Sequence, residues 1–454
     1  MHPPFPFEPF LEFGFLSIVL IIGVILRAKL PVLQRFLFPS CLIGGFLGLI
    51  VISTGFIDFD ITHFETFAYH FFIISFISVG LTTSSDRKKE PGSNKKMLRG
   101  ALWMALIEGV TLPMQAVIGG LLVLMYGLLG KDLFPTFGFM LPLGFTEGPG
   151  QALSFGKVWE GFGFAHAATI GLTFAAIGFF FSFFVGVPLV NWGIRRGMAA
   201  DGTTELSRDI LKGIVPRDQK KEKAGELTMH SGNVDTIAFQ AALIGLVYVL
   251  VYGLVQLLIK VVPPDIGKML WGFFFFFGLF VALIVRWLMA RIGVDHLIDP
   301  GVQKRLTGWA VDFLIVSTVI AIQMVVVWQY ILPIAVTAGV GGLLTTLVVF
   351  YLGKRIDTLN LERTAAIYGT CTGTVSSGLL LLRIVDPDFK TPVALEVGIM
   401  NVIVVPIILG CMLLVNAPVL WHWSLGMTIL VFVVIFAVCL ALIRILKYWG
   451  EPKY

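Results

Sequence analysis

The sequence predicts an all-α protein that crosses a membrane many times, and three observations lead to this prediction. Apolar residues make up 57% of the 454-residue chain and charged residues only 13%, whereas soluble globular chains carry about 25% charged residues. The apolar residues form long runs, most of which suit a membrane helix of about 20 residues. The basic residues gather in a few short loops between these runs, and the formal net charge is only +5.

Thirteen apolar runs follow one another along the chain, and each predicts a helical segment. Six of them precede a polar stretch at 197–234, and seven follow it. The runs cover residues 11–29, 37–54, 65–83, 99–129, 133–155, 163–194, 236–262, 268–290, 307–322, 324–352, 362–384, 391–416 and 421–446. The four cysteines lie in these runs without metal-ligand spacing, so we expect buried free thiols.

The two halves of the chain share a spaced set of glycine motifs. A Gly-Gly pair at Gly119 recurs 222 residues later at Gly341, and a Gly-x3-Gly motif at Gly144 recurs 225 residues later at Gly369. A Gly-Lys dipeptide between these landmarks keeps a spacing of 223 residues (130 to 353). Nearly constant spacing indicates an internal duplication, although such motifs also match by chance in a Gly-rich membrane protein.

The loops predict how the chain is oriented in the membrane. Residues 27–35 and 86–99 are rich in Lys and Arg, whereas the loop between them carries acidic residues and no Lys or Arg. Short basic loops stay in the cytoplasm. We therefore expect the N-terminus outside the cell, and the central stretch and the C-terminus in the cytoplasm.

This orientation requires two of the runs to enter and leave the membrane on the same side. Residues 133–155 contain GFTEGPG, and residues 362–384 contain GTCTGTVSSG. If residues 133–155 crossed the membrane, the basic pair at 195–196 would lie outside, against the positive-inside rule. Glycine and proline also break helices, so we predict a re-entrant hairpin in each run.

The predicted domain organisation follows from this count. Residues 1–196 form a first repeat, 197–234 a cytoplasmic linker, 235–416 a second repeat, and 417–454 an additional C-terminal transmembrane helix and tail. Each repeat contains five crossings and one re-entrant hairpin. Because five is odd, the sequence predicts two inverted repeats of five transmembrane helices.

Paired broken segments in inverted halves indicate the binding site of a transporter. The N-terminus of a half-helix offers free N–H groups to an anion, whereas hydroxyl and carboxylate oxygens suit a small cation. We expect substrate contacts from Thr146, Gly148, Gln151, Thr374, Ser376, Ser377, Arg383 and Asn401. We expect contacts to the coupling ion from Glu147, Thr370, Thr372 and Gly373, with Na⁺ at Glu147, Thr372 and Ser377.

These residues also have structural interpretations. The hydroxyls could bond to their own helices, and the small residues could serve close helix packing. Glu147 could lie at the solvent mouth of its hairpin, and Arg383 could extend to the membrane surface. Glu396 and Asn401 could reach the site or form hydrogen bonds between helices. Glu108 lies within a helix and has no predicted role.

These motifs together resemble the bacterial sodium/glutamate symporters. The resemblance rests on the two Gly-rich hairpins, on VGLTTSSDRKK…KMLRG after the third run, and on GWAVDFLIVSTVIAIQ, which contains Asp312. It implies inverted five-helix repeats, a homodimer, and an elevator movement of a core domain against a scaffold. In that family a histidine stands near the middle of the first Gly-rich motif, where this chain has Glu147.

The sequence therefore predicts Na⁺-coupled symport of glutamate or a similar small organic anion across the cytoplasmic membrane. A proton-coupled organic-anion carrier and a 2-hydroxycarboxylate or dicarboxylate transporter are alternatives, and a channel is a further one. We find no nucleotide-binding, metalloprotease or nucleophile motif, so we predict no enzyme activity and no cofactor beyond the coupling ion. The expected partners are the anion, Na⁺, membrane lipids and a second copy of the chain, with no nucleic acid.

Overall fold

The computed structural model describes residues 5, 7–57, 59–82, 93–200, 208–217, 223–387 and 389–452. All regular secondary structure within these ranges is helical, which confirms the predicted all-α class. Part of the evidence for the predicted orientation lies outside the described residues, namely Asp58, the basic residues at 87–89, and the segments 201–207 and 218–222 of the central stretch.

Nine helices among the described residues are long and apolar enough to cross a membrane. They are α1 (Glu8–Lys29), α4 (Ile61–Leu81), α5 (Ser93–Leu128), the continuous α8 (Ala167–Phe180), η2 (Phe181–Gly186) and α9 (Val187–Arg195), α11 (Thr236–Ile259), α13 (Phe274–Arg291), α16 (Ile331–Gly353), α19 (Val393–Leu414) and α21 (Leu425–Ile445). The sequence predicted eleven crossings. The two remaining candidates are α3 (Ser40–Ser53), which is short, and α14 (Pro300–Ile320), which carries charged residues near its start.

The other described elements are shorter. They are α2 (Pro31–Arg35), η1 (Phe137–Phe139), α6 (Met140–Phe145), α7 (Pro149–Glu160), α10 (Arg208–Lys212), α12 (Pro264–Gly272), η3 (Asp295–Leu297), α15 (Met324–Gln329), α17 (Asn360–Thr372), α18 (Val375–Val385) and α20 (Ala417–Leu420). The elements α6, α7, α17 and α18 form the two predicted broken segments, and both breaks lie within the ranges predicted from the sequence.

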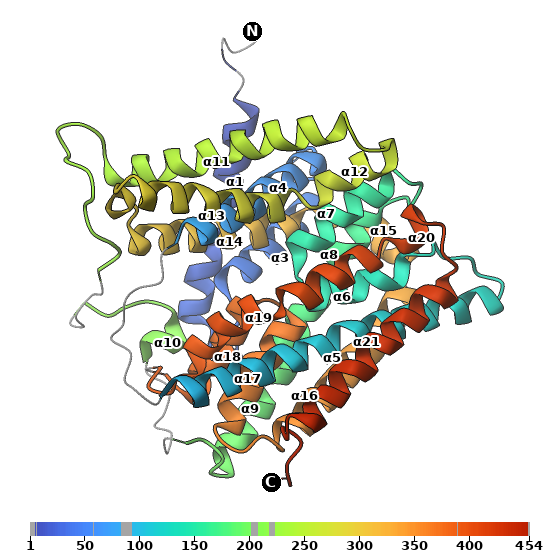
Figure 1. The fold of residues 1–454 in the computed structure, drawn as a ribbon. Helices are drawn as coiled ribbons and strands as arrows, with labels where there is room; N and C mark the ends of the chain where they lie inside the picture. Colours follow the sequence, from blue (N-terminus) through green and yellow to red (C-terminus); the bar gives the residue numbers. More distant parts are fainter. Residues whose placement is uncertain are drawn as a thin grey trace.

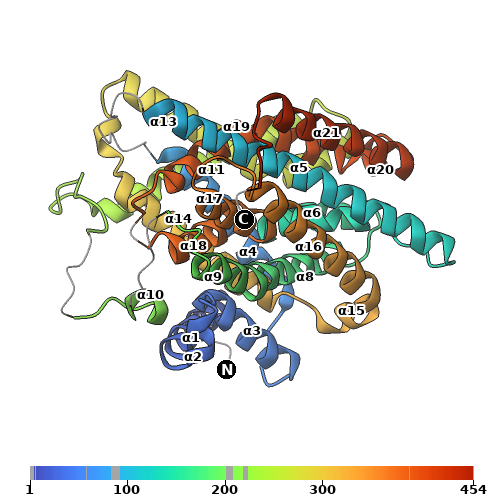
Figure 2. The ribbon, with the colours of Figure 1, turned by 90° about the horizontal axis from the view of Figure 1, so that it is seen from below.

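The helices pack into two bundles, which Figure 1 shows one above the other. The first bundle consists of α1, α3, α4, α11, α13 and α14, with α4 against α13 and α14, and α14 also against α3. The second bundle consists of α5 to α9, α16 to α19 and α21, with α5 against α19 and α21 (Figure 2). Small residues allow close approach, as where Gly80 of α4 meets Ala282 of α13.

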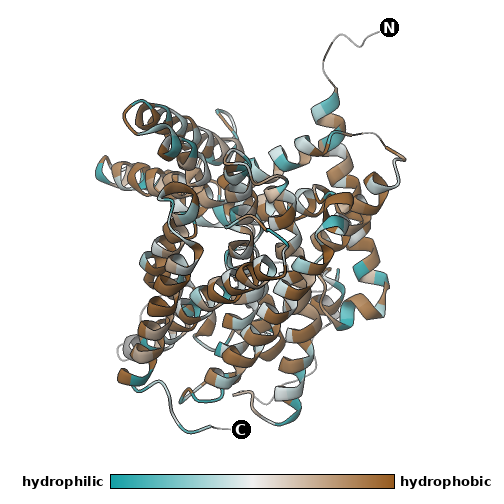
Figure 3. Ribbon diagram, turned by 90° about the vertical axis from the view of Figure 1, so that its right-hand side faces the viewer, coloured by the Kyte–Doolittle hydropathy of each residue, from teal (hydrophilic) through white to brown (hydrophobic). Residues whose placement is uncertain are grey.

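Apolar side chains cover the outer surface of the bundles. On α11, large apolar side chains are exposed at Ile237, Leu246, Val249, Leu250 and Leu257. Figure 3 shows hydrophobic residues along the lengths of the helices and hydrophilic residues mostly at their ends and in loops. Soluble monomers rarely expose apolar surfaces of this extent. The chain is therefore a polytopic membrane protein.

The first broken segment returns along the helix that follows it. Met140, at the start of α6, lies against Gly171 of α8, and Gly144 lies one turn further along α8, at Ala175. After the break, Ala152 of α7 lies against Gly171 again. The two arms, α6 and α7, are therefore antiparallel, as a hairpin requires.

The second broken segment is also a hairpin. A Cβ atom added to Gly369 of α17 would lie 2.7 Å from Cα of Gly378 in α18, so the two backbones are in direct contact. Gly186, at the end of the π-helical segment η2, contacts both Tyr368 of α17 and Leu381 of α18. The two arms thus lie side by side, and the chain reverses direction at Gly373 and Thr374.

Candidate functional site

The two helix breaks contact each other inside the protein. Gly148, in the first break, has φ 88° and ψ −177°, a conformation that essentially only glycine adopts. A Cβ atom at Gly148 would lie 2.9 Å from the Thr374 methyl carbon and 3.2 Å from the Gly373 carbonyl oxygen. Residues about 225 positions apart in the chain therefore form one centre.

A buried glutamine of α5 connects both breaks. The Gln115 side chain is fully buried, and its Oε1 accepts a hydrogen bond of 2.8 Å from the Thr146 hydroxyl. Its Nε2 donates to the Cys371 carbonyl oxygen and to the Thr345 hydroxyl, each at 3.1 Å. The Thr146 hydroxyl also lies 3.3 Å from the Cys371 carbonyl oxygen. In the sequence, Gln115 is recognisable only as a polar residue within an apolar run.

A cavity of about 420 Å³ lies beside the breaks, between the two bundles. The second bundle contributes the polar residues Glu108, Thr146, Glu147, Gln151, Thr370, Thr374, Ser376 and Asn401, and also the apolar residues Pro149, Val375, Val405, Ile408, Leu409 and Met412. The first bundle and the residue before α13 contribute the apolar residues Phe72, Phe76, Val79, Phe273, Phe275, Phe276, Leu279, Val311, Leu314 and Ile315, with the hydroxyls of Ser75 and Thr307. All acidic and amide side chains of the lining thus lie on the wall of the second bundle, which is mixed polar and apolar, and the opposite wall is largely apolar.

Most of the predicted site residues line this cavity, but three side chains do not. Of the predicted substrate contacts, Thr146, Gln151, Thr374, Ser376 and Asn401 line it, and of the predicted ion contacts, Glu147 and Thr370 do. Gly148 and Gly373 form the breaks beside it. The side chains of Thr372, Ser377 and Arg383 are not part of its lining.

Thr372 and Ser377 lie around Gly373, away from the cavity lining. The Thr372 hydroxyl is 2.7 Å from the Ser182 hydroxyl and donates to the Tyr368 carbonyl oxygen at 2.7 Å. A Cβ atom at Gly373 would lie 2.8 Å from Ser377 Oγ and 2.9 Å from Ser182 Oγ. The structure therefore does not bring Glu147, Thr372 and Ser377 together as the lining of one cavity.

Arg383 and Glu396 have partners elsewhere. Arg383 is exposed, and its guanidinium carbon lies 4.9 Å from the centre of the Phe389 ring. Glu396 is fully buried and forms two hydrogen bonds of 2.7 Å with Arg363, so it is a buried ion pair between α19 and α17. Asn401, on the same helix as Glu396, does reach the cavity.

Two carboxyl groups in the cavity wall lack partners for one oxygen each. Glu147 is partly exposed, its Oε2 accepts from Gln151 Nε2 at 3.4 Å, and its Oε1 is buried without a hydrogen-bond partner. Glu108 of α5 is 3% exposed, and its Oε2 is likewise buried without a partner. None of the described residues that line the cavity is Lys, Arg or His. A carboxyl group within an apolar helix was the signal that could have identified Glu108.

Two helices begin at the breaks. The α7 helix starts at Pro149 with Gly148 as its N-cap, and α18 starts at Val375 with Thr374 as its N-cap. Pro149, Gly150, Gln151, Val375 and Ser376, all in the first turns of these helices, line the cavity. The first N–H groups of a helix have no partner within the helix and carry a partial positive charge. The polar wall therefore offers N–H donors as well as carboxylates.

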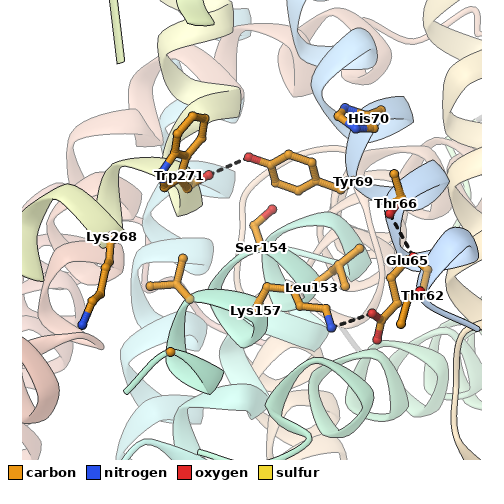
Figure 4. Close-up of a pocket in the computed structure, with 12 residues that line it drawn as sticks. Thr62, Glu65, Thr66, Tyr69, His70, Leu153, Ser154, Lys157, Lys268 and Trp271 are labelled. Carbon is orange, nitrogen blue, oxygen red and sulfur yellow. Dashed lines mark hydrogen bonds and ion pairs between the residues drawn. The ribbon is translucent and has the colours of Figure 1, made fainter. Parts of the chain in front are cut away.

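A second cavity, of about 600 Å³, lies further along α7 (Figure 4). Here Lys157 of α7 forms an ion pair of 2.5 Å with Glu65 of α4, and Figure 4 shows the two side chains pointing toward each other. The Tyr69 hydroxyl donates to the Trp271 carbonyl oxygen at 2.8 Å. Both bundles thus meet in a charged contact at this cavity.

A cluster of aromatic side chains lines the cavity beside the breaks. Phe72 lies against Gly150, so closely that no Cβ atom fits there. The ring centres of Phe72, Phe76 and Phe275 form a cluster, with Phe72–Phe76, Phe72–Phe275 and Phe76–Phe275 each 4.9 Å apart. Residues of α4 and α7 line both cavities. The aromatic cluster belongs to the cavity of about 420 Å³ beside the breaks.

Comparison with known proteins identifies one family. A family model described as the sodium/glutamate symporter matches residues 11–373 of the chain. The matched region includes the first bundle and the first hairpin, and it ends at the second break. A comparison with curated proteins found no match.

Proposed function

Since the chain belongs to the sodium/glutamate symporter family, we propose that it couples the movement of Na⁺ to the uptake of glutamate or a similar small organic anion. One observation carries this proposal: two helix breaks meet at one cavity, where helix N-termini and a carboxylate face the same space. This arrangement offers complementary groups to an anion and to a cation at once.

The N-termini of α7 and α18 bind the anion in this proposal. The free N–H groups of their first turns, together with the Ser376 and Thr374 hydroxyls, suit the oxygen atoms of a carboxylate. Gln151 and Asn401 add amide donors from the same wall. The cavity has a volume of about 420 Å³, which accommodates a small organic anion with its coupling ion. Arg383, which is exposed on α18, has no part in this arrangement.

Glu147 binds the cation in this proposal. Its unpartnered Oε1 faces no donor among the described residues, and the neighbouring Thr146 hydroxyl and the carbonyl groups of the breaks supply further oxygen ligands. A small cation prefers such oxygen ligands, and carbonyl groups of unwound helices commonly coordinate Na⁺ in transporters. Because cation and anion then sit side by side, each favours the binding of the other, which is the thermodynamic basis of coupling.

We further propose that the second bundle moves against the first as an elevator, and that the chain is made of two inverted repeats. The apolar wall supplied by the first bundle supports this movement, because the described polar residues of the second bundle's wall form no hydrogen bond with it, although the ion pair between Lys157 and Glu65 has to open. Matched packing supports the repeats: α1 packs on α3 and α3 on α14, while α11 packs on α13 and α13 on α4. A homodimer in the cytoplasmic membrane, with its N-terminus outside, completes this proposal.

Uptake by proteoliposomes tests the proposed function. Labelled glutamate is offered with an inward Na⁺ gradient, and in a parallel sample with K⁺ in place of Na⁺. We expect accumulation only with Na⁺, and Glu147→Gln is expected to abolish the Na⁺ dependence while leaving the protein folded. Uptake that is equal with Na⁺ and with K⁺ would contradict Na⁺ coupling. Uptake driven by an inward proton gradient alone would favour the proton-coupled alternative, with Glu147 as the proton carrier.

Counterflow distinguishes a carrier from a channel. Vesicles loaded with unlabelled glutamate are expected to exchange it for labelled glutamate faster than empty vesicles take it up, because a carrier exposes its site to one side at a time. The exchange must also saturate with external glutamate. Flux that rises linearly with concentration, without counterflow, would indicate a channel and would overturn the proposed carrier.

A further inference from the structure

We infer that Glu108 of α5 is a second anionic ligand of the cation site, and that Glu108 and Glu147 together take up at least two positive charges, as Na⁺ or H⁺, for each substrate carried. This inference rests on the proposed function, because it concerns the coupling ions of the same cavity. It assigns a role to a helix that lies outside both hairpins.

The position of Glu108 supports this inference. Glu108 lies on α5, lines the cavity together with Glu147, and is 3% exposed. Its Oε2 and the Oε1 of Glu147 are buried oxygens that no described residue partners. A buried carboxyl oxygen without a partner is unfavourable unless a cation or a proton binds it, and this wall contains two such oxygens.

Among the described residues that line the cavity, no cationic side chain balances the pair. The Cys371 thiol lies nearby, where its Sγ accepts a hydrogen bond from the Thr111 hydroxyl. On the opposite wall, α4, α13 and α14 present apolar side chains and the hydroxyls of Ser75 and Thr307. No Lys, Arg or His is found among the described residues of the lining.

The charges of the site set a lower limit on the number of coupling ions. Two ionised carboxyl groups give the wall a charge of −2, and an anionic substrate adds at least one more negative charge. Burying an unbalanced charge in an apolar medium is strongly unfavourable, and charged groups within membranes are accordingly paired or functional. Two bound cations or protons neutralise the wall itself, which is the basis of the proposed minimum of two positive charges for each substrate.

The structure explains why Glu108 is held in this place. Its backbone carbonyl oxygen accepts a hydrogen bond of 3.2 Å from the Thr111 hydroxyl, which also donates to Cys371 Sγ at 3.1 Å. One turn further along α5, Gln115 connects the two breaks. The segment 108–115 therefore contacts both hairpins through Thr111 and Gln115, which places Glu108 on the part of α5 that lies next to the breaks.

The test measures how steeply uptake depends on Na⁺, using the full-length protein in proteoliposomes. At saturating glutamate and fixed pH, wild type is expected to show a Hill coefficient for Na⁺ near 2, and Glu108→Gln a coefficient near 1. Stabilisation by Na⁺ alone, without substrate, is measured in parallel by thermal unfolding in detergent. Here Glu108→Gln is expected to raise the half-maximal Na⁺ concentration about tenfold or more, the effect typical of losing a metal contact.

A matched control separates this role from a general effect of removing a buried carboxyl group. Glu362 is 1% exposed and also has an unpartnered Oε2, but it does not line the cavity. We expect Glu362→Gln to leave the Hill coefficient and the half-maximal Na⁺ concentration unchanged. If Glu108→Gln does not fold, Glu108→Asp keeps the charge with a shorter reach, and a several-fold weaker Na⁺ effect is expected.

The outcomes distinguish this inference from the proposed function. Suppose that wild type takes up glutamate with Na⁺, but that both Glu108 variants show the wild-type Hill coefficient for Na⁺ and the wild-type thermal stabilisation by Na⁺. Glu108 is then no ligand and the inference is wrong. If the Hill coefficient stays at 1 in wild type while Glu108→Gln removes a dependence on the proton gradient, the second charge is H⁺. If wild type shows neither Na⁺- nor H⁺-dependent uptake, the proposed function itself fails.

Discussion

The ion pair between Lys157 and Glu65 leads to an asymmetric prediction. It joins α7 of the second bundle to α4 of the first, at a distance of 2.5 Å. The Glu65 side chain is 5% exposed, whereas that of Lys157 is 43% exposed and also contacts Glu160 at 3.1 Å. Removing the lysine therefore leaves a buried carboxylate alone, whereas removing the carboxylate leaves a partly hydrated lysine with a second partner.

The exposed fractions set the expected magnitudes. Removing one partner from a fully buried ion pair costs about 3–5 kcal/mol. Because water reaches Lys157, we expect a smaller loss of about 1–3 kcal/mol for Lys157→Gln. For Glu65→Gln we expect about 0–1 kcal/mol, the usual value of an exposed pair. The double variant is expected to regain most of the loss of Lys157→Gln, because it no longer contains the lone carboxylate.

Thermal unfolding in detergent, followed by intrinsic tryptophan fluorescence, measures this ranking. Lys268→Gln serves as the control, because Lys268 lines the same cavity but forms an exposed pair with Asp265 at 3.3 Å. Its unfolding temperature is expected to stay within error of wild type. The reasoning is refuted if Glu65→Gln destabilises the protein as much as Lys157→Gln, or if the double variant is the least stable of the three.

Three further predictions use the same unfolding assay. Gly148→Ala is expected to lower the free energy of unfolding by about 1–3 kcal/mol, because the φ of 88° and ψ of −177° at Gly148 strain any other residue. Gly127→Ala is the control, since a Cβ atom at Gly127 meets nothing within 4 Å, and its stability should not fall. Equal effects of the two substitutions would contradict this reasoning. Gln115→Leu removes the hydrogen bonds that connect the two breaks and is expected to lower the free energy of unfolding by about 1–3 kcal/mol. Stabilisation by Na⁺ is also expected to weaken. An unchanged stabilisation by Na⁺ would show that Gln115 does not support the ion site. Asp60 caps α4 by accepting from the Thr62 N–H group at 2.9 Å, which lowers the pKa of Asp60, and Asp60→Ala is expected to cost about 1 kcal/mol at neutral pH. Because the folded-state pKa is lowered, this stabilisation is present above the ordinary carboxyl pKa and disappears as the pH falls through the lowered value, so wild type and variant should converge in acid; a constant difference would argue against the cap.

The helical class and the positions of the helix breaks could be predicted from the sequence, because both are local properties. Within a membrane a long apolar run forms a helix, because a helix satisfies the hydrogen-bonding groups of its own backbone. Glycine and proline clustered at 144–150, and glycines with hydroxyl residues at 369–378, favour a helix break, and the structure breaks at Gly148 and Gly373, whereas the isolated Pro113 and Pro406 lie within continuous helices. The count of crossings was less certain, since α3 is short and α14 carries charges that lower its hydropathy.

The composition of the candidate site was only partly predictable. Thr146, Glu147 and Gln151 could be selected because they are polar and lie beside a helix break, but Thr372 and Ser377 fit the same description and lie away from the lining. Glu396, also polar and within an apolar helix, instead pairs with Arg363, and nothing in the local pattern distinguishes these two outcomes.

The sequence by itself determined that this chain is a membrane protein with two interrupted segments, because hydropathy and helix-breaking residues act over a few neighbouring positions. Only the tertiary structure decided that Glu108 shares a cavity with Glu147, that Gln115 joins the two breaks, and that Thr372 lies away from the lining. The physical reason is that membrane helices are apolar on most of their faces, so their sequences do not show which face turns inward. That choice depends on contacts between helices far apart in the chain, and it is made when the bundles pack.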